Sequence, residues 1–389
     1  GLMQKKSGVV RVGRRNRTRQ KKTKYCDYSL FFLIIFLLGF GLVMLYSVSA
    51  YNANERYGDP MHYLRRQGLA VVLGIAAMTL ISRIDYHVWF YFGNLAYLLA
   101  FGLCAIVLIP GIGNEAKGSA RWIPLGPLSF QPSEFAKLAM ILFLSGLVCR
   151  IPKQIAKFTN LVKVMIMIVP IFVIVAYENL STGIIIMGIA NVITFVASPK
   201  VGQFVAMVSV GVVGGGVVFI MAAGYRMDRI KAWLHPEDYT DGTAFQTIQG
   251  LYAIGSGGLF GKGLGQSMQK LGFVPEAQND MIFSIICEEL GLFGAFCVIL
   301  LFLLMIWRLM VIANNAADLY GALIVSGIMA HIAIQVILNI SVVTNTIPNT
   351  GITLPFISYG GTSTSFLLAE MGLALSVSRG IRLEGSGND

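Results

Sequence analysis

The chain has 389 residues, of which 56% are hydrophobic and only 13% are charged, and its mean hydropathy is +0.71. Soluble domains carry about a quarter charged residues, so this composition excludes an ordinary soluble protein and indicates a polytopic membrane protein. The net charge of +11 comes from one tail, because residues 1–24 hold ten Lys and Arg and no acid, whereas the other 20 basic residues face 19 acids. We expect residues 1–26 to form a disordered cytoplasmic tail that lies on anionic lipid and orients the first helix, and we expect no nucleic-acid partner.

Ten apolar runs are long enough, at roughly 17–25 residues, to span a bilayer as helices. They cover residues 28–50, 67–83, 87–109, 132–149, 161–177, 182–198, 203–223, 281–307, 318–343 and 364–380. An even number of spans places both termini on one side, and the basic tail assigns that side to the cytoplasm. The sequence therefore predicts an all-α polytopic membrane protein of about ten transmembrane helices, with a membrane domain over residues 27–380 and a cytoplasmic tail over residues 381–389.

Three connections fall on the predicted exterior side, at residues 110–131, 224–280 and 344–363. The second of them, between helices 7 and 8, is the largest, and long ordered loops on a rigid scaffold are where function tends to lie. The third contains "PNTGITLPFISYGGTS" over residues 348–363, which is rich in Pro, Gly and hydroxyl groups. Non-helical backbone near membrane depth is tolerated where it is buried in protein or lines water, so we predict that this segment forms a cavity wall.

The glycine-rich stretch "GSGGLFGKGLG", residues 255–265, does not have the order of a nucleotide-binding loop, because Lys262 is followed by Gly263. We therefore expect no nucleotide cofactor. Consecutive backbone N–H groups could still hold a phosphate. Tight packing of the loop against a helix is the simpler interpretation, and we favour it.

The stretch "QPSEFAKL", residues 131–138, has the features of a helix start. Pro132 suits the first turn, and Glu134 complements the helix dipole there. Glu134 and Lys137 are three residues apart, so they share a face and can pair. Such a pair inside the membrane should face the bundle interior or a wet cavity, and it could also be purely structural. Arg121 lies shortly before this stretch, next to Trp122, which we expect to anchor the loop at the membrane interface.

His331, Gln335 and Asn339 recur at every fourth position of the ninth run, so they form one polar stripe that must face inward. Interhelical hydrogen bonding accounts for this stripe without any chemistry, and a substrate contact is the alternative.

Three acids fall on or beside the eighth run, in "PEAQNDMIFSIICEELG", residues 275–291. Asp280 comes just before the run, near a helix N-terminus that favours the ionised form, and we expect it to be accessible from outside. Glu288 and Glu289 lie about 12 Å deeper, so we interpret them as structural. A carboxylate placed like Asp280 can accept a proton or hold a cation.

Four stretches in chain order resemble the SEDS family, which includes FtsW, RodA and SpoVE: "RWIPLGPLSFQPSEFAKL", "AIGSGGLFGKGLG", "LGFVPEAQNDMIFSIICEELG" and "TGITLPFISYGG". The last stretch and the basic tail resemble FtsW or SpoVE more than RodA. The resemblance implies a peptidoglycan glycosyltransferase of the bacterial cytoplasmic membrane that polymerises lipid II at the outer face. It also implies a class B penicillin-binding protein as partner, with divisome or elongation-complex proteins around the pair.

The resemblance also suggests which residues act. The essential carboxylate of the family falls on Asp280, whereas the usual His and Thr before it are Gln278 and Asn279 here, and a family Asp is replaced by Asn179, to which we assign no catalytic role. The implied substrate-binding residues are Arg121, Gln131, Glu134, Lys137, Glu276, Ser358, Tyr359 and Gly360. A divalent cation, Mg²⁺ or Mn²⁺, would bind at Asp280 if one is used.

Lipid II carries its sugar on an α-linked pyrophosphate and the polymer linkage is β, so the implied reaction inverts configuration and needs one base. We expect Asp280 to accept the proton of the acceptor hydroxyl, and Arg121, Lys137 or a divalent cation to stabilise the leaving pyrophosphate. Two alternatives stay open: a lipid II flippase, which would use Glu288, Glu289 and His331 for transport, and a scaffold that recruits the penicillin-binding protein through the basic tail.

Overall fold

The structure is a computed structural model of the chain and describes residues 26–109, 114–116, 119–125, 128–151, 157–198, 200–221, 223–239 and 244–381. The two predicted tails therefore lie outside the described residues, apart from Cys26 and Ile381.

Each of the ten predicted runs forms a helix: α1 (Tyr28–Tyr57), α2 (His62–Arg83), α3 (Val88–Val107), α4 (Pro132–Arg150), α5 (Phe158–Glu178), α6 (Leu180–Ala197), α7 (Val201–Met221), α10 (Ile282–Asn314), α11 (Leu319–Val343) and α12 (Gly361–Arg379). Within the described ranges, eight of these helices are long and apolar enough to cross a membrane. The apolar stretch of α7 is shorter, at Val201–Val217, and α12 contains Glu370 and several Ser and Thr. An all-helical multi-pass membrane protein is thus confirmed, and ten spans stays a prediction.

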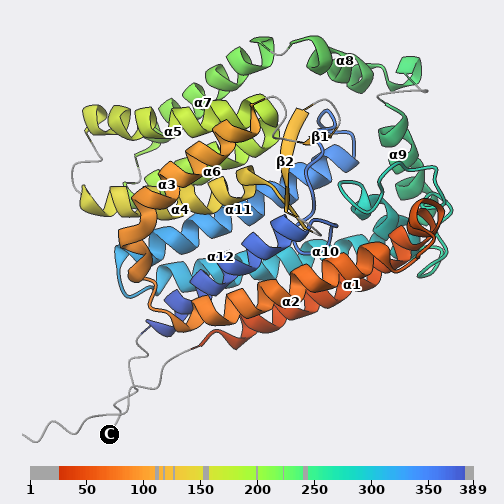
Figure 1. Cartoon of the computed structure of the whole chain (residues 1–389), viewed down its shortest axis with the longest axis horizontal. Coiled ribbons are helices and arrows are strands. Elements are labelled where there is room, and N and C mark those ends of the chain that lie inside the picture. Colours follow the sequence, from red (N-terminus) through yellow and green to blue (C-terminus); the bar gives the residue numbers. More distant parts are fainter. Residues whose placement is uncertain are drawn as a thin grey trace, which may run out of the picture.

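The connections predicted as loops contain structure of their own. A small antiparallel sheet is formed by β1 (Asn114–Ala116), β2 (Ser119–Leu125) and β3 (Leu128–Phe130), in that order. The long connection contains α8 (Ala223–Leu234), a 3₁₀ turn at Pro236–Tyr239 and α9 (Phe245–Gly257). These additions surround one end of the bundle (Figure 1).

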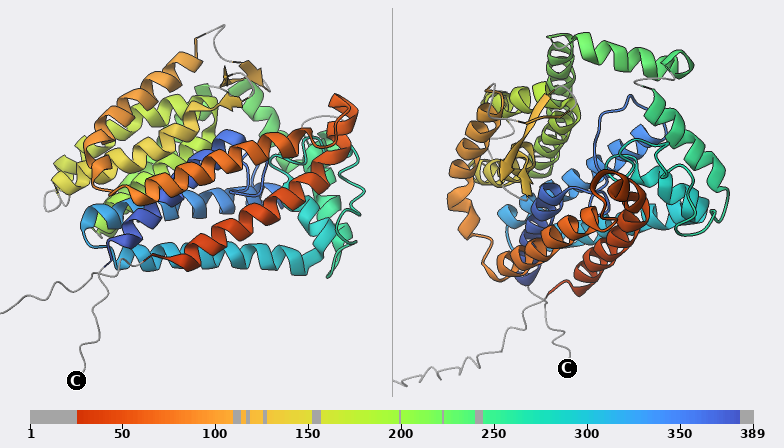
Figure 2. Two further views of the ribbon diagram at one scale, coloured as in Figure 1. Left: turned by 60° about the horizontal axis from the view of Figure 1, so that its bottom comes forward. Right: turned by 45° about the vertical axis from the view of Figure 1, so that its right-hand side comes forward.

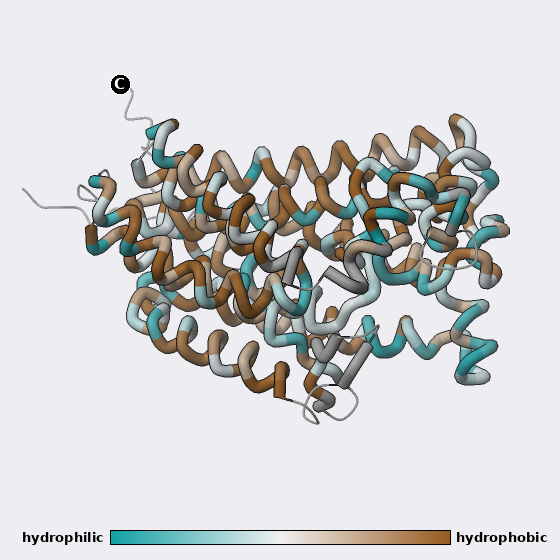
Figure 3. The backbone as a smooth tube through the Cα atoms, turned by 90° about the horizontal axis from the view of Figure 1, so that it is seen from above, coloured by the Kyte–Doolittle hydropathy of each residue, from teal (hydrophilic) through white to brown (hydrophobic). Residues whose placement is uncertain are grey.

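α4, α6 and α11 are the most buried of the candidate spans, since most of the apolar window of each is buried, whereas well under half of this window is buried in α1, α2, α3 and α5. Hydrophobic residues predominate along the bundle (Figure 3). The chain enters and leaves at one end (Figure 2). There the Asp27 N–H donates to Ser378 Oγ at 3.3 Å, and Arg308 pairs with the Asp27 carboxylate at 2.5 Å. The start of α1, the end of α12 and the later part of α10 are thereby joined at the same end, as an even number of crossings requires.

The glycine-rich stretch packs onto a break in α10. Gly291 has a left-handed φ of +68°, which interrupts the helix and frees carbonyl groups before it. Four backbone hydrogen bonds of 2.9–3.0 Å fill the break: from the N–H groups of Lys262 and Gly263 to the carbonyls of Glu288 and Glu289, and from the N–H groups of Leu292 and Phe293 to the carbonyls of Gly258 and Leu259. The packing interpretation of this stretch is therefore confirmed.

Gly257→Ala is expected to destabilise the protein, because the added Cβ would lie 1.9 Å from the backbone oxygen of Cys287. Overpacking of this kind typically costs about 1–3 kcal/mol. Gly255→Ala is the matched control on the same helix, since its Cβ would meet nothing within 4 Å, and it should be neutral or stabilising by up to about 1 kcal/mol. Thermal unfolding of the two purified variants measures the difference; equal midpoints would contradict the packing.

Candidate active site

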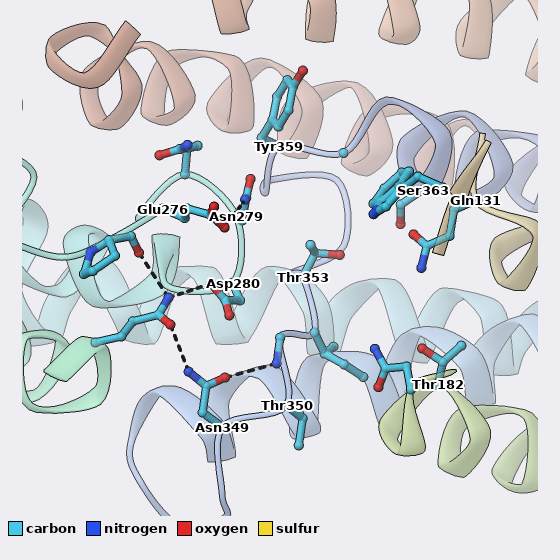
Figure 4. Close-up of a pocket in the computed structure, with 18 of the residues that line it drawn as sticks. Gln131, Thr182, Glu276, Asn279, Asp280, Asn349, Thr350, Thr353, Tyr359 and Ser363 are labelled. Carbon is cyan, nitrogen blue, oxygen red and sulfur yellow. Dashed lines mark hydrogen bonds between the residues drawn. The ribbon is translucent and has the colours of Figure 1, made fainter. Parts of the chain in front are cut away.

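A cavity of about 980 Å³ opens among α4, α6, the segment before α10 and the segment before α12 (Figure 4). Seven of the nine predicted site residues line it: Gln131, Glu134, Lys137, Glu276, Asp280, Tyr359 and Gly360. Ser358 does not; it is buried, and its hydroxyl accepts a hydrogen bond from the Leu354 N–H at 2.8 Å. The side chain of Arg121 lies outside the described residues. Stretches far apart in sequence therefore converge on one polar cavity.

Asp280 ends the segment that leads into α10, and its side chain reaches the cavity although the residue is only 3% exposed. The expectation of an open position is thus too simple, because neighbouring segments cover it. Gln246 donates from Nε2 to Asp280 Oδ1 at 3.0 Å, and Asn339 donates to the Asp280 carbonyl at 2.9 Å. A second donation from Asn339, to the Ile352 carbonyl at 2.7 Å, connects this turn to the opposite wall.

Glu134 and Lys137 form the predicted pair, with 2.9 Å between Oε2 and Nζ. Both side chains are almost fully buried and both line the cavity, so each neutralises the other inside the bundle. Lys137 also donates to Gln335 Oε1 at 3.2 Å, which connects α4 to α11.

The polar stripe of α11 continues this network into the bundle. His331 Nε2 lies 2.9 Å from Gln335 Oε1, and His331 Nδ1 lies 2.7 Å from Glu370 Oε2 of α12. Because Gln335 Oε1 faces the Lys137 ammonium, His331 must donate from Nε2, and one proton then lies between Nδ1 and Glu370. Interhelical hydrogen bonding, the favoured interpretation of the stripe, is confirmed, and Gln335 additionally lines the cavity.

Glu288 and Glu289 lie outside the cavity lining. Glu288 pairs with Lys262 at 2.7 Å, and Glu289 pairs with Lys270 at 2.8 Å. Ser47 of α1 donates to Glu289 at 2.9 Å. Their structural interpretation is confirmed: these acids hold the long connection against α10 and α1.

Tyr359 connects two walls of the cavity, since its N–H donates to the Gln278 carbonyl at 2.9 Å and its ring packs edge-on to Tyr63 at 5.0 Å. Burial raises the pKa of the Tyr359 phenol, the nearby Arg66 only partly opposing it, so the hydroxyl stays neutral and can donate. Gly360 is held by its N–H, which donates to Gln67 Oε1 at 3.1 Å.

Four residues of the cavity lining were not singled out from the sequence: Arg56, Thr182, Arg229 and Gln246. Asn349 also lines the cavity and belongs to residues 348–363, whose predicted place in a cavity wall is confirmed. Asn179, set aside for lack of a carboxylate, lines the cavity and also caps α6 by accepting the Ser181 N–H at 3.1 Å. A polar residue beside an apolar run was the available signal at Asn179. Gln246 lies at the start of α9 and Asn349 lies in a loop. Polar residues are common at both kinds of position, so neither one indicates a site.

The lining of the cavity includes three bases and three acids: Arg56, Lys137, Arg229, Glu134, Glu276 and Asp280. Its volume is at the upper end of small-molecule sites, and its polar lining suits a sugar or phosphate group better than an apolar ligand. Within the described ranges, no three His, Cys, Asp or Glu side chains form a metal-binding group. Mg²⁺ often takes one or two carboxylates together with substrate phosphates and water, and Asp280 with Glu276 would suit that mode.

A family profile for FtsW, RodA and SpoVE, described as "Cell cycle protein", matches residues 28–382. Stage V sporulation protein E of Bacillus subtilis (strain 168) is 43% identical over 355 residues, which cover 91% of this chain and 97% of that protein. A probable peptidoglycan glycosyltransferase FtsW of Geobacter sp. (strain M18) is 35% identical over 92% of this chain and 97% of that protein.

Solved structures share the fold. A chain from a peptidoglycan synthase complex that coordinates polymerization and crosslinking superposes with a TM-score of 0.76 at 27% identity, covering 92% of this chain and 99% of that one. The rod shape determining protein RodA of Thermus thermophilus superposes with a TM-score of 0.67 at 26% identity, covering 92% and 98%. Sequence and fold agree along nearly the whole length, and the chain belongs to the FtsW/RodA/SpoVE family, the SEDS proteins.

Proposed function

We propose that this protein is a peptidoglycan glycosyltransferase that polymerises lipid II by inverting glycosyl transfer. The observation that carries the proposal is the position of Asp280, a carboxylate at the wall of a large polar cavity in which Glu134 and Lys137 neutralise each other. The relative named as a probable peptidoglycan glycosyltransferase supports the same activity.

In the proposed reaction, Asp280 accepts the proton of the acceptor 4-hydroxyl as that oxygen attacks the anomeric carbon of the donor. The new bond is carbon to oxygen, and the bond from the anomeric carbon to the pyrophosphate oxygen breaks in the same displacement. The departing pyrophosphate gathers negative charge, which Lys137, Arg56 and Arg121 would stabilise. A bound divalent cation, Mg²⁺ or Mn²⁺, would supply further charge neutralisation for that group.

We also infer the topology: ten spans, both termini in the cytoplasm, and a cavity that opens at the exterior face of the bacterial cytoplasmic membrane. The basic tail and the meeting of Asp27 with Ser378 at one end support it. The segments over residues 110–131, 224–280 and 344–363, which carry most of the cavity wall, would then be exterior.

A class B penicillin-binding protein is the proposed partner, since the synthase complex of similar fold combines polymerization with crosslinking. Division, sporulation or shape control is the proposed setting, with divisome or elongation-complex proteins around the pair.

The flippase alternative would need the polar lining to cross the bundle. The cavity lining includes Gln335 of α11. His331, one turn before Gln335 on α11, and Glu370 of α12 do not line the cavity; they are fully buried and paired with each other. This arrangement favours chemistry at one face. The scaffold alternative predicts that recruitment of the partner, and not glycan synthesis, depends on residues 1–24.

The full chain, purified with its transpeptidase partner, is expected to convert labelled lipid II into glycan polymers that form a ladder on a gel. Parallel reactions with and without Mg²⁺ or Mn²⁺ test the cation. A complex that moves labelled lipid II across vesicles but forms no polymer under any of these conditions would overturn the proposal in favour of transport.

A further inference from the structure

Two amide side chains connect Asp280 to the opposite wall of the cavity (Figure 4). Gln246, at the start of α9, donates from Nε2 to Asp280 Oδ1 at 3.0 Å and to the Pro275 carbonyl at 3.1 Å. Asn349 donates from Nδ2 to Gln246 Oε1 at 3.1 Å, and the Gly351 N–H donates to Asn349 Oδ1 at 3.1 Å. The chain of hydrogen bonds thus runs from the Gly351 N–H to the Pro275 carbonyl, through the side-chain amides of Asn349 and Gln246.

The direction of this chain is fixed by its ends. A side-chain amide can in general present either its oxygen or its NH₂ group to a neighbour. The Gly351 N–H can only donate, so Asn349 must present its oxygen there and its NH₂ group to Gln246. Gln246 then presents its oxygen to Asn349 and its NH₂ group to the Pro275 carbonyl and to Asp280. The Asp280 carboxylate consequently receives a donor at Oδ1.

We propose that Gln246 and Asn349 form an amide clamp, a pair of positioning residues that hold the Asp280 carboxylate in its working orientation with Oδ1 unprotonated. The inference rests on the proposed function, in which Asp280 is the base. A hydrogen bond donated to an ionised carboxylate favours the ionised form, which is the form that can accept a proton. The other oxygen, Oδ2, faces Gly351, where an added Cβ would lie 3.8 Å away, and Gly351 itself lines the cavity.

The clamp joins α9, which carries Gln246, to the segments before α10 and α12, which carry Asp280 and Asn349. Its geometry therefore depends on how these three parts of the chain pack together. Arg229 of α8 donates from Nη1 to the Asn349 carbonyl at 3.0 Å, which fixes the backbone of the clamp from outside. Among the described residues, the other charged or titratable groups that line the cavity are Arg56, Glu134, Lys137, Glu276 and Tyr359. These groups stay unchanged in the variants below, so a difference between variants reports the clamp.

The test is the dependence of polymerisation rate on pH, measured with labelled lipid II and the full chain in complex with its transpeptidase. Gln246→Glu places a second carboxylate against Asp280, and two such groups share a proton. The acidic limb of the profile should move to higher pH by about one unit or more, so that the rate at a given pH on this limb falls about tenfold and recovers as pH rises. Gln266→Glu is the matched control, the same change at an exposed position outside the cavity, and should leave the profile unchanged.

Asn349→Asp tests the direction of the chain without touching Asp280. The substitution replaces the NH₂ group that faces Gln246 with a carboxylate oxygen. Gln246 must then turn its NH₂ group toward this new oxygen and its own oxygen toward Asp280. The acidic limb should again move to higher pH, because Asp280 loses its donor and a negative charge is added nearby, whereas a loss of folded protein would lower the rate at every pH. This variant also serves if Gln246→Glu fails to give a single peak in size exclusion.

The outcomes separate the clamp from the function on which it rests. An Asp280→Asn complex that retains the wild-type rate would overturn Asp280 as base, and the clamp with it. An inactive Asp280→Asn complex, together with wild-type pH profiles for both folded clamp variants, would overturn the clamp alone.

Discussion

Asp280→Asn is expected to lower the rate of lipid II polymerisation by about 10²–10⁴-fold, the usual contribution of a positioned general base. Asn has the shape of Asp, and its oxygen can still accept the hydrogen bond that Gln246 donates at 3.0 Å. The substitution therefore removes the charge and the proton acceptor while it preserves the wall of the cavity. Initial rates of polymer formation by the purified complex measure the effect.

Asp238→Asn is the matched control for this experiment. Asp238 lies exposed in the same long connection and does not line the cavity, so its variant should polymerise at the wild-type rate. The Asp280→Asn chain should also elute with its partner and unfold at the wild-type temperature. A variant that keeps more than about a tenth of the wild-type rate would show that Asp280 is not the base, because a tenfold loss corresponds to only about 1.4 kcal/mol of barrier.

The helices could be predicted from the sequence because the lipid interior strongly restricts the backbone conformations that can cross it. A run of about twenty apolar residues must satisfy its backbone internally, and a helix is the local way to do so. The added helices α8 and α9 and the small sheet were not predicted, because short, mixed-polarity segments carry no such constraint. Glu134 and Lys137 could be paired from their spacing on one helix, since that contact is local.

Contacts between distant segments could not be predicted in the same way. Gln246 and Asn349 are 103 positions apart, and nothing in either neighbourhood marks them as partners. The pairing of Glu370 with His331 was not predicted either, because the two residues lie on different helices. An acid within an apolar run indicates a buried partner, but it does not say which residue the partner is. Asp280 was expected to be open to solvent because it precedes a helix. Only the fold shows that Gln246 of α9 and Asn339 of α11 pack against it. Asp280 could therefore be proposed as the base from the sequence alone, whereas the side chains that hold it could not be predicted.

Lys270→Met is expected to lower the free energy of unfolding by about 3–5 kcal/mol, because it leaves the fully buried Glu289 carboxylate without its cation. The side chain of Lys270 is only 8% exposed, and its Nζ contacts both Glu289 Oε1 and Ser47 Oγ, so water cannot easily replace it. Thermal or denaturant unfolding of the purified full chain measures the loss.

Two further variants separate charge from packing. Lys262→Met should cost less, because the Lys262 side chain is 35% exposed and Glu288 also accepts hydrogen bonds from the N–H groups of Met268 and Gln269. The double variant Lys270→Met with Glu289→Leu removes both charges and should recover much of the stability that the single variant loses, as apolar replacements of buried pairs often do. If the double variant is no more stable than Lys270→Met alone, the loss comes from packing and not from a stranded charge. Recovery would mean that these acids, deep in an apolar helix, serve to hold the connection that carries Asp280 against α10.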